Sequence, residues 1–234
     1  MCTVTFIPKN NHDFILTSNR DEAPGRKTSP PQHYIREGTS LLYPEDAVAG
    51  GTWIGLSGKK RLICLLNGGF TAHEREDSYR LSRGIIVMDL LTASNISEAI
   101  THYDFKGIEP FTIILVTFEG DTKIFELVWD GIKAHFEEKP LSPQIWSSSL
   151  LYDAAMKAAR ETWFSTFLFD TLKPTTSEIL NFHTTAGVGD KAIDLVMDRG
   201  FVKTKSITQI HKTADSIKMQ YHDLEENLLT ETTL

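Results

Sequence analysis

The first 22 residues constrain the fold most, because two strand-like runs in them are separated by a short turn. Thr3–Ile7 alternates and is rich in β-branched residues, and Phe14–Thr17 has the same character. Between them, Pro8–Asp13 is turn-forming, so the two runs predict a β-hairpin. A hairpin returns the chain to its start. The polar segment Asn19–Asp21 is therefore predicted to lie close to Cys2.

A cysteine at position 2 has chemical consequences. Removal of the initiator methionine would leave a thiol and a free α-amine on one residue, which is a nucleophile with its own base. The ordinary pKa values of these groups, about 8.5 and about 7.7 to 8.0, allow neighbours to tune both near neutrality. Arg20 would favour the thiolate, and Asp21 would hold and orient the ammonium. If Met1 were retained, this mechanism would fail.

Each of these features also has a structural interpretation. Taken singly, Cys2 fits a small apolar residue on an inward strand face, and Asn19–Glu22 fits a solvated turn. In combination they resemble the NRDE-motif family, also called the transport and Golgi organisation 2 family, which is placed with the N-terminal nucleophile (Ntn) hydrolases. Further motifs extend the resemblance along most of the chain: Gly50–Gly55, Asn67–Gly69, Ser82–Gly84 and Ser148–Leu151.

The resemblance implies an α+β fold, the αββα four-layer sandwich of two antiparallel sheets flanked by helices. The predicted order of strands, helices, strands, helices and strands suits two antiparallel sheets covered by helices. No Ser/Gly-rich or Pro-rich run of linker length divides the 234 residues. We therefore expect one Ntn-hydrolase-like domain over residues 1–234.

Composition narrows the classes of partner. The formal net charge of −7 does not indicate a basic face for nucleic acid. No apolar run approaches the roughly 20 residues of a membrane helix. The N-terminus lacks a signal-peptide core, so a cytoplasmic protein is expected. Two cysteines and eight scattered histidines show no metal-ligand spacing. We expect a small-molecule substrate or ligand, no metal, no cofactor, no membrane span and no nucleic acid, with a homo-oligomer left open.

Local patterns predict the remaining elements. Ala23–Tyr43 carries three prolines and two glycines, which favours a surface loop. The expected strands are Ala47–Leu56, Arg61–Leu66, Phe111–Phe118, Lys123–Trp129 and Ile132–Glu137, followed by a hairpin of Thr204–His211 and Ser216–His222. Helices are expected from Tyr79, from Ser94-Asn95, over Leu151–Phe167 with Ser148 or Ser149 as its cap, and over Ser177–Phe182.

Three further residues are candidates for the site. Asn67 ends a buried run, where it is either a turn residue or an amide donor to a substrate carbonyl. Trp53 offers a flat apolar surface, which fits either core packing or a pocket wall. Ser148 stands where the family, and more distantly the choloylglycine-hydrolase-like enzymes, carry an Asn assigned to the oxyanion hole. We predict Cys2, Arg20, Asp21 and Asn67 as catalytic residues, and Asn19, Trp53 and Ser148 as substrate-binding residues.

The chain departs from the distant enzymes at the arginine. Those enzymes carry R-N-x-D, whereas this chain places Arg20 between Asn19 and Asp21. Near Lys205 many relatives carry an arginine, and lysine keeps the charge without the bidentate fork. The resemblance implies hydrolysis of a non-peptide C–N bond by Cys2. The alternatives are a carrier of an acyl-lipid or haem-like ligand and a structural scaffold, although a scaffold would leave the clustered motifs unexplained.

Overall fold

The computed structural model describes residues 3–234, which form two compact units, each built on one antiparallel sheet. The first unit joins the chain up to Arg26 with Ser142–Thr233, and the second holds Lys27–Leu141. The predicted α+β class, two antiparallel sheets flanked by helices, is confirmed. The expectation of a single domain over residues 1–234 stays a prediction.

The first sheet contains the predicted N-terminal hairpin, with Thr3 opposite Asn19. In order across the sheet the strands are β10 (Gln144–Ser147), β1 (Thr3–Pro8), β2 (Phe14–Glu22), β11 (Lys203–Lys212), β12 (Ile217–Asp223) and β13 (Leu228–Thr233). The strand β2 is longer than expected, because it continues through the polar tetrad and pairs on its other side with β11. The sequence pattern does not predict β13, which adds a third strand to the C-terminal hairpin.

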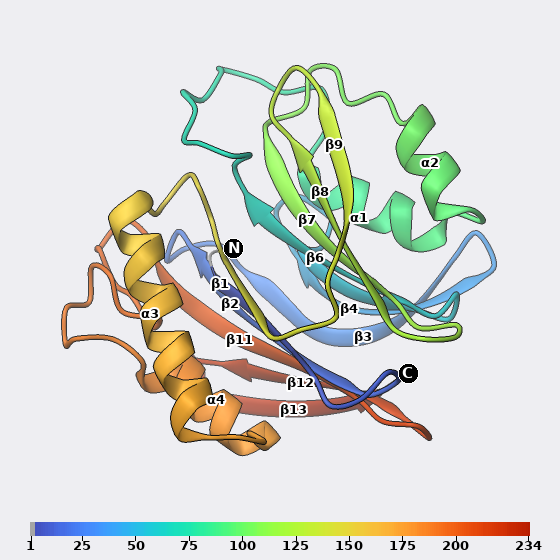
Figure 1. Cartoon of the computed structure of the whole chain (residues 1–234). Helices are drawn as coiled ribbons and strands as arrows, with labels where there is room; N and C mark the ends of the chain where they lie inside the picture. The colour runs from blue at the N-terminus through green and yellow to red at the C-terminus, as the bar shows by residue number, and fades with distance from the viewer. Residues whose placement is uncertain (1–2) are drawn as a thin grey trace. The chain divides into compact units, whose positions relative to one another are not determined.

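Helices α3 (Ala154–Asp170) and α4 (Thr176–Thr185) lie along this sheet (Figure 1). Ile7 and Ile15 on the hairpin pack against a cluster from the helices and the following loop: Phe164, Ile179, Phe182 and Leu195. The predicted cap of α3 was wrong. Asp153 caps it by accepting a hydrogen bond from the Met156 N–H at 2.9 Å, because the chain continues beyond Ser148 and Ser149 before the helix begins.

The second sheet begins with two strands where a loop was predicted, so that expectation was wrong. The order across the sheet is β3 (Thr28–Arg36), β4 (Thr39–Asp46), β5 (Ile54–Ser57), β6 (Arg61–Asn67), β7 (Phe111–Thr117), β8 (Lys123–Trp129) and β9 (Ala134–Lys139). Pro30 and Pro31 are tolerated because β3 is an edge strand whose pairing register shifts between Ser29 and Gln32. At such an irregularity a missing N–H removes no ladder hydrogen bond.

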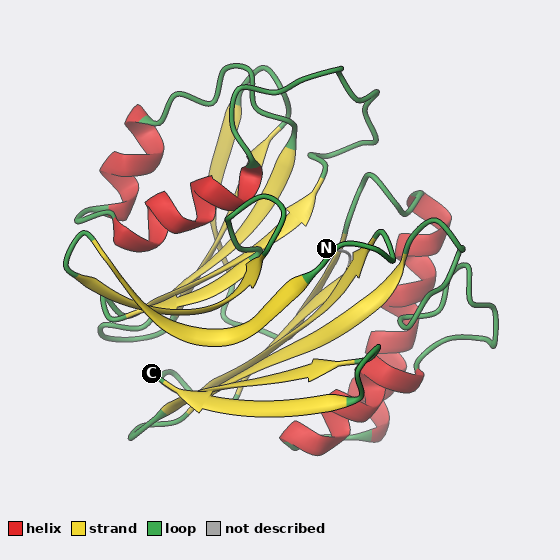
Figure 2. Cartoon of the chain, turned by 180° about the vertical axis from the view of Figure 1, so that it is seen from behind, coloured by secondary structure: helices red, strands yellow, loops and turns green. Residues whose placement is uncertain are grey.

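Helices α1 (Arg83–Thr92) and α2 (Ile96–His102) belong to the second unit (Figure 2). The end of α1 is fixed by the β5–β6 hairpin, since Ser57, Lys59 and Arg61 donate to the carbonyls of the last helical turn. These donors satisfy carbonyls that the helix leaves unpaired. The strand predicted from Ala47 is shorter, because residues 47–50 form a turn and Gly51 then pairs with Asp46 before β5 begins. Among the described helices, none is long and apolar enough to span a membrane.

Two of the glycine motifs meet in this unit. A Cβ atom on Gly51 would lie 2.7 Å from the backbone carbon of Gly84, and a Cβ on Gly84 would lie 3.0 Å from the nitrogen and oxygen of Thr52. The segment before β5 and the start of α1 therefore pack backbone against backbone. A larger residue would not fit at either position, so glycine is required.

We expect Gly84→Ala to destabilise the protein by about 1–3 kcal/mol, because the added methyl overpacks a backbone contact. This reverses the usual gain of alanine over glycine in a helix. Thermal unfolding would measure the effect. Gly120→Ala is the matched control, since nothing lies within 4 Å of the position that its methyl would take, and its melting temperature should barely change. Equal melting temperatures for the two variants would contradict this account.

Candidate active site

The tetrad Asn19–Glu22 lies on β2, where successive side chains point to opposite faces. Asn19 and Asp21 contact groups from α4, from the segment before α3 and from β11. Arg20 and Glu22 alternate with them and form an ion pair, with Nη2 and Oε2 3.9 Å apart. The strand therefore divides the predicted cluster between two faces.

Asp21 is a buried carboxylate with two hydroxyl donors. Its side chain is 2% exposed. The Tyr152 hydroxyl donates to Oδ2 at 2.7 Å, and the Thr204 hydroxyl donates to Oδ1 at 2.5 Å. The Thr204 oxygen in turn accepts the backbone N–H of Met197 at 2.9 Å. These bonds fix the orientation of the carboxylate, as an orienting acid requires.

Asn19 is held by a second network that includes His183. Its Nδ2 group donates to the carbonyls of His183 (3.0 Å) and Leu195 (2.7 Å), so Oδ1 faces the imidazole Nδ1 at 2.6 Å. Nδ1 therefore carries the proton, and Nε2 accepts from the Thr5 hydroxyl at 2.7 Å. Both Asn19 amide hydrogens are used inside the protein, which favours a positioning role over the predicted contact with substrate.

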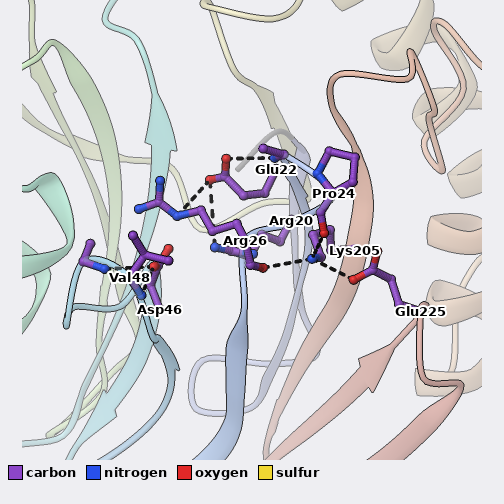
Figure 3. A network of polar contacts seen from close by, with 10 residues as sticks. Arg20, Glu22, Pro24, Arg26, Asp46, Val48, Lys205 and Glu225 are labelled. Atoms are coloured by element: carbon purple, nitrogen blue, oxygen red, sulfur yellow. Dashed lines mark hydrogen bonds and ion pairs between the residues drawn. The ribbon is translucent and has the colours of Figure 1, made fainter.

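Lys205 fixes the loop that follows the tetrad (Figure 3). Its ammonium group donates to the carbonyls of Pro24 (2.6 Å) and Arg26 (2.8 Å) and contacts Glu225 at 2.7 Å. Three acceptors match its three hydrogens. Burial alone would raise the pKa of Glu225, but the bonds from Lys203 and Lys205 outweigh it and lower that pKa. The charge of Lys205 is therefore used to hold this loop.

Asn19 and Ser148 lie at the same end of the first sheet, on or just after strands that flank β1. Thr3 pairs with both Asn19 and Ser147, so the ends of β1, β2 and β10 meet. Ser148 follows β10 directly, is 1% exposed, and accepts the Tyr152 N–H through its carbonyl at 3.1 Å. Cys2 lies outside the described residues, and its role stays a prediction.

Asn67 and Trp53 belong to the second unit. Asn67 is the last residue of β6, and Gly68 follows it with a φ of 88°, a left-handed conformation that suits glycine at this turn. Trp53 is 4% exposed and lies just before β5, where its carbonyl accepts the Leu65 N–H at 2.7 Å. The predicted roles of both residues stay predictions.

Sequence reasoning missed four residues that hold this end of the sheet: Tyr152, Arg160, His183 and Thr204. Each lies more than 130 positions from the tetrad residue or strand that it supports. No spacing rule connects positions so far apart. The helix predicted over Ser177–Phe182 was also too short, because α4 continues through His183 to Thr185.

The His183 network predicts a pH dependence of stability. Burial, assisted by the nearby Arg160 cation, lowers the pKa of His183 to about 3, whereas an unfolded chain has a pKa near 6.5. Between these values the unfolded state binds a proton that the folded state does not. Stability is therefore complete above pH 6.5 and falls as the pH drops toward 3, by about 2 kcal/mol at pH 5.

Chemical denaturation at pH 7.5 and pH 5.0 would measure this loss, and His183→Gln should reduce it. Gln209→Met is the control, because it removes buried hydrogen bonds to Thr17 and Thr176 without removing a titrating group. Its stability should fall equally at both pH values. Identical pH profiles for wild type and His183→Gln would contradict the assignment.

Comparison with solved structures identifies the fold. A variant of conjugated bile acid hydrolase from Clostridium perfringens matches with a TM-score of 0.64 and 10% identity, covering 99% of this chain and 92% of that one. Penicillin V acylase from Agrobacterium tumefaciens gives 0.57 and 13% over 100% and 86%. The Caenorhabditis elegans ortholog of N-acylethanolamine-hydrolyzing acid amidase gives 0.60 and 13% over 89% and 92%. The likeness confirms the predicted Ntn-hydrolase-like fold.

Sequence comparison identifies the family. A search of curated proteins found no match. The profile of the family described as Transport and Golgi organisation 2 matches residues 1–162 of the 234. The resemblance carried by the tetrad and the glycine motifs is thus confirmed, and this chain belongs to the Transport and Golgi organisation 2 family.

Proposed function

We propose that this protein is an N-terminal-cysteine hydrolase that cleaves the non-peptide C–N bond of a small acylated substrate. The names of the structural neighbours, a hydrolase, an acylase and an amidase, support this class of reaction. The observation that carries the proposal is the buried Asp21 carboxylate. Two hydroxyl groups orient it near Thr3, where β1 begins. An ordered carboxylate at this position suits the orientation of a catalytic amine.

In the proposed reaction the Cys2 sulfur attacks the substrate carbonyl carbon and forms a C–S bond. The α-amine of Cys2 takes the thiol proton and passes it to the leaving nitrogen as the C–N bond breaks. Water then attacks the thioester, giving one proton to the thiolate through the amine and releasing a carboxylic acid. Both products and the free thiol are accounted for.

The other residues have supporting roles in this proposal. Asp21 orients the Cys2 amine, and Arg20 stabilises negative charge on the sulfur. Asn67 and a backbone N–H stabilise the oxyanion, and the Ser148 hydroxyl supplies a shorter donor where relatives carry asparagine. Trp53 contributes an apolar wall. We propose a cytoplasmic location, as the sequence predicts.

The nucleophile is tested by thiol reactivity and by turnover. Limiting iodoacetamide at neutral pH should modify Cys2 well before Cys64, which is fully buried on β6. Intact mass should show that Met1 is removed. The wild type should release acid from one of a panel of N-acyl amides, and Cys2→Ala should not. Ligand binding that survives Cys2→Ala, with no turnover of any substrate, would favour the carrier instead.

A second test addresses Asp21. Asp21→Asn should lower kcat by roughly 10²- to 10⁴-fold, because the orienting charge is lost. It should also cost about 1–3 kcal/mol of stability. The new amide NH₂ would face either the Tyr152 or the Thr204 hydroxyl, and that hydroxyl would lose its acceptor in a buried site. Thr204→Val is the matched control. It removes the hydrogen bond to Asp21 and the one from the Met197 N–H but keeps the Asp21 charge, so it should lose comparable stability but only about tenfold in kcat. Equal losses of kcat in the two variants would make Asp21 structural.

A further inference from the structure

We propose that Arg160 is a positioning residue for the proposed reaction. Its single guanidinium group holds both Tyr152, which donates to Asp21, and Thr3, which is bonded directly to Cys2. The inference rests on the proposed function and deepens it.

The first contact of Arg160 is with the Tyr152 ring. The guanidinium carbon lies 3.4 Å from the ring centroid, so the planar cation stacks on the ring face. A ring held on its face cannot tilt without losing this contact. The hydroxyl at the ring edge is thereby kept 2.7 Å from Asp21 Oδ2.

The second contact of Arg160 is with the start of the chain. Its Nη1 donates to the Thr3 hydroxyl at 2.6 Å. Thr3 is the first described residue of β1 and is paired with Asn19 and Ser147. The same cation thus fixes the residue next to the proposed nucleophile and the donor to the proposed orienting carboxylate.

The remaining nitrogens hold the guanidinium in place. Nε and Nη2 donate to the Ile193 carbonyl at 3.3 and 2.9 Å, and Nη2 also donates to the Asp194 carbonyl at 3.0 Å. These bonds use the rigid fork of arginine, which lysine lacks. The group therefore points in one direction relative to both Tyr152 and Thr3.

The burial of this cation argues against a role in stability alone. Arg160 is fully buried, and among the described residues its guanidinium nitrogens donate to one hydroxyl and to two backbone carbonyls. Its acceptors are neutral, so the cost of removing the charge from water is not repaid by an ion pair. A methionine would fill similar volume without that cost. The cation is accounted for by the two groups that it positions, the Tyr152 ring and the Thr3 hydroxyl.

A double-mutant cycle tests the proposal with the full-length processed protein and a turned-over N-acyl amide. Tyr152→Phe and Arg160→Met should each lower kcat roughly 10- to 100-fold, with KM within about twofold, because substrate contacts are untouched. The double variant should lose less than the product of the single losses, since part of the Arg160 effect acts through the Tyr152 hydroxyl that the other variant already removes. Gln209→Met, on the same helix-facing side of the sheet, should lower the melting temperature and leave kcat unchanged.

If Arg160→Met does not fold, Tyr152→Phe and the isosteric Thr3→Val carry the test. Unchanged kcat in both would overturn the proposal. So would multiplicative losses in the cycle, or an Arg160→Met protein that melts lower and keeps the wild-type kcat. If the wild type hydrolyses no amide, the proposed function fails separately. The rate of Cys2 alkylation then reads the Arg160 effect, and equal rates in wild type, Arg160→Met and Tyr152→Phe would overturn it.

Discussion

The hydrogen bonding of the buried Asp21 carboxylate is the interaction on which the polar end of the first unit depends. A carboxylate removed from water must be hydrogen-bonded. Two of its donors are the hydroxyl groups of Tyr152 and Thr204, which are 131 and 183 positions away in the sequence. The hydrogen bonds to this one side chain therefore hold the segment before α3 and the start of β11 against the end of β2.

The part of this arrangement that could be predicted from the sequence is the local part. The N-terminal hairpin follows from the alternation of Thr3–Ile7 and the turn at Pro8–Asp13, and the C-terminal hairpin follows from similar signals. The tetrad could be recognised as a candidate site, but its division between two strand faces could not. This division requires β2 to continue through Glu22, and β2 does so because it pairs with β11 there. Tyr152, Arg160 and His183 had no local signal, because their roles exist only after long-range pairing.

The errors of prediction have physical causes of the same kind. The prolines of Ala23–Tyr43 forbid a helix and disfavour a central strand, but they do not forbid an edge strand with an irregular register. Whether a strand is at an edge is a property of the whole sheet. Similarly, the glycines at 51 and 84 could be recognised as motif residues, but the backbone contact between them could not be inferred from either motif alone.

The helix-facing side of the β1–β2 pair changes character along its length, and this bears on whether the polar end has a function. At the turn end, Ile7 is opposite Ile15 and both pack into the apolar cluster beneath α3 and α4. In the middle, Thr5 is opposite Thr17, and at the far end Thr3 is opposite Asn19. The apolar end anchors the helices.

A sheet face covered by helices is most stable when it is apolar, because every buried polar group there must find a partner. This chain instead places polar networks at the end nearest its start, and they include a neutral histidine, a carboxylate and a cation without an ion-pair partner among the described residues. Departures of this kind from the apolar pattern concentrate at functional sites. One pair of strands therefore anchors the helices at its apolar end and holds the groups of the proposed chemistry at its polar end, beside Thr3.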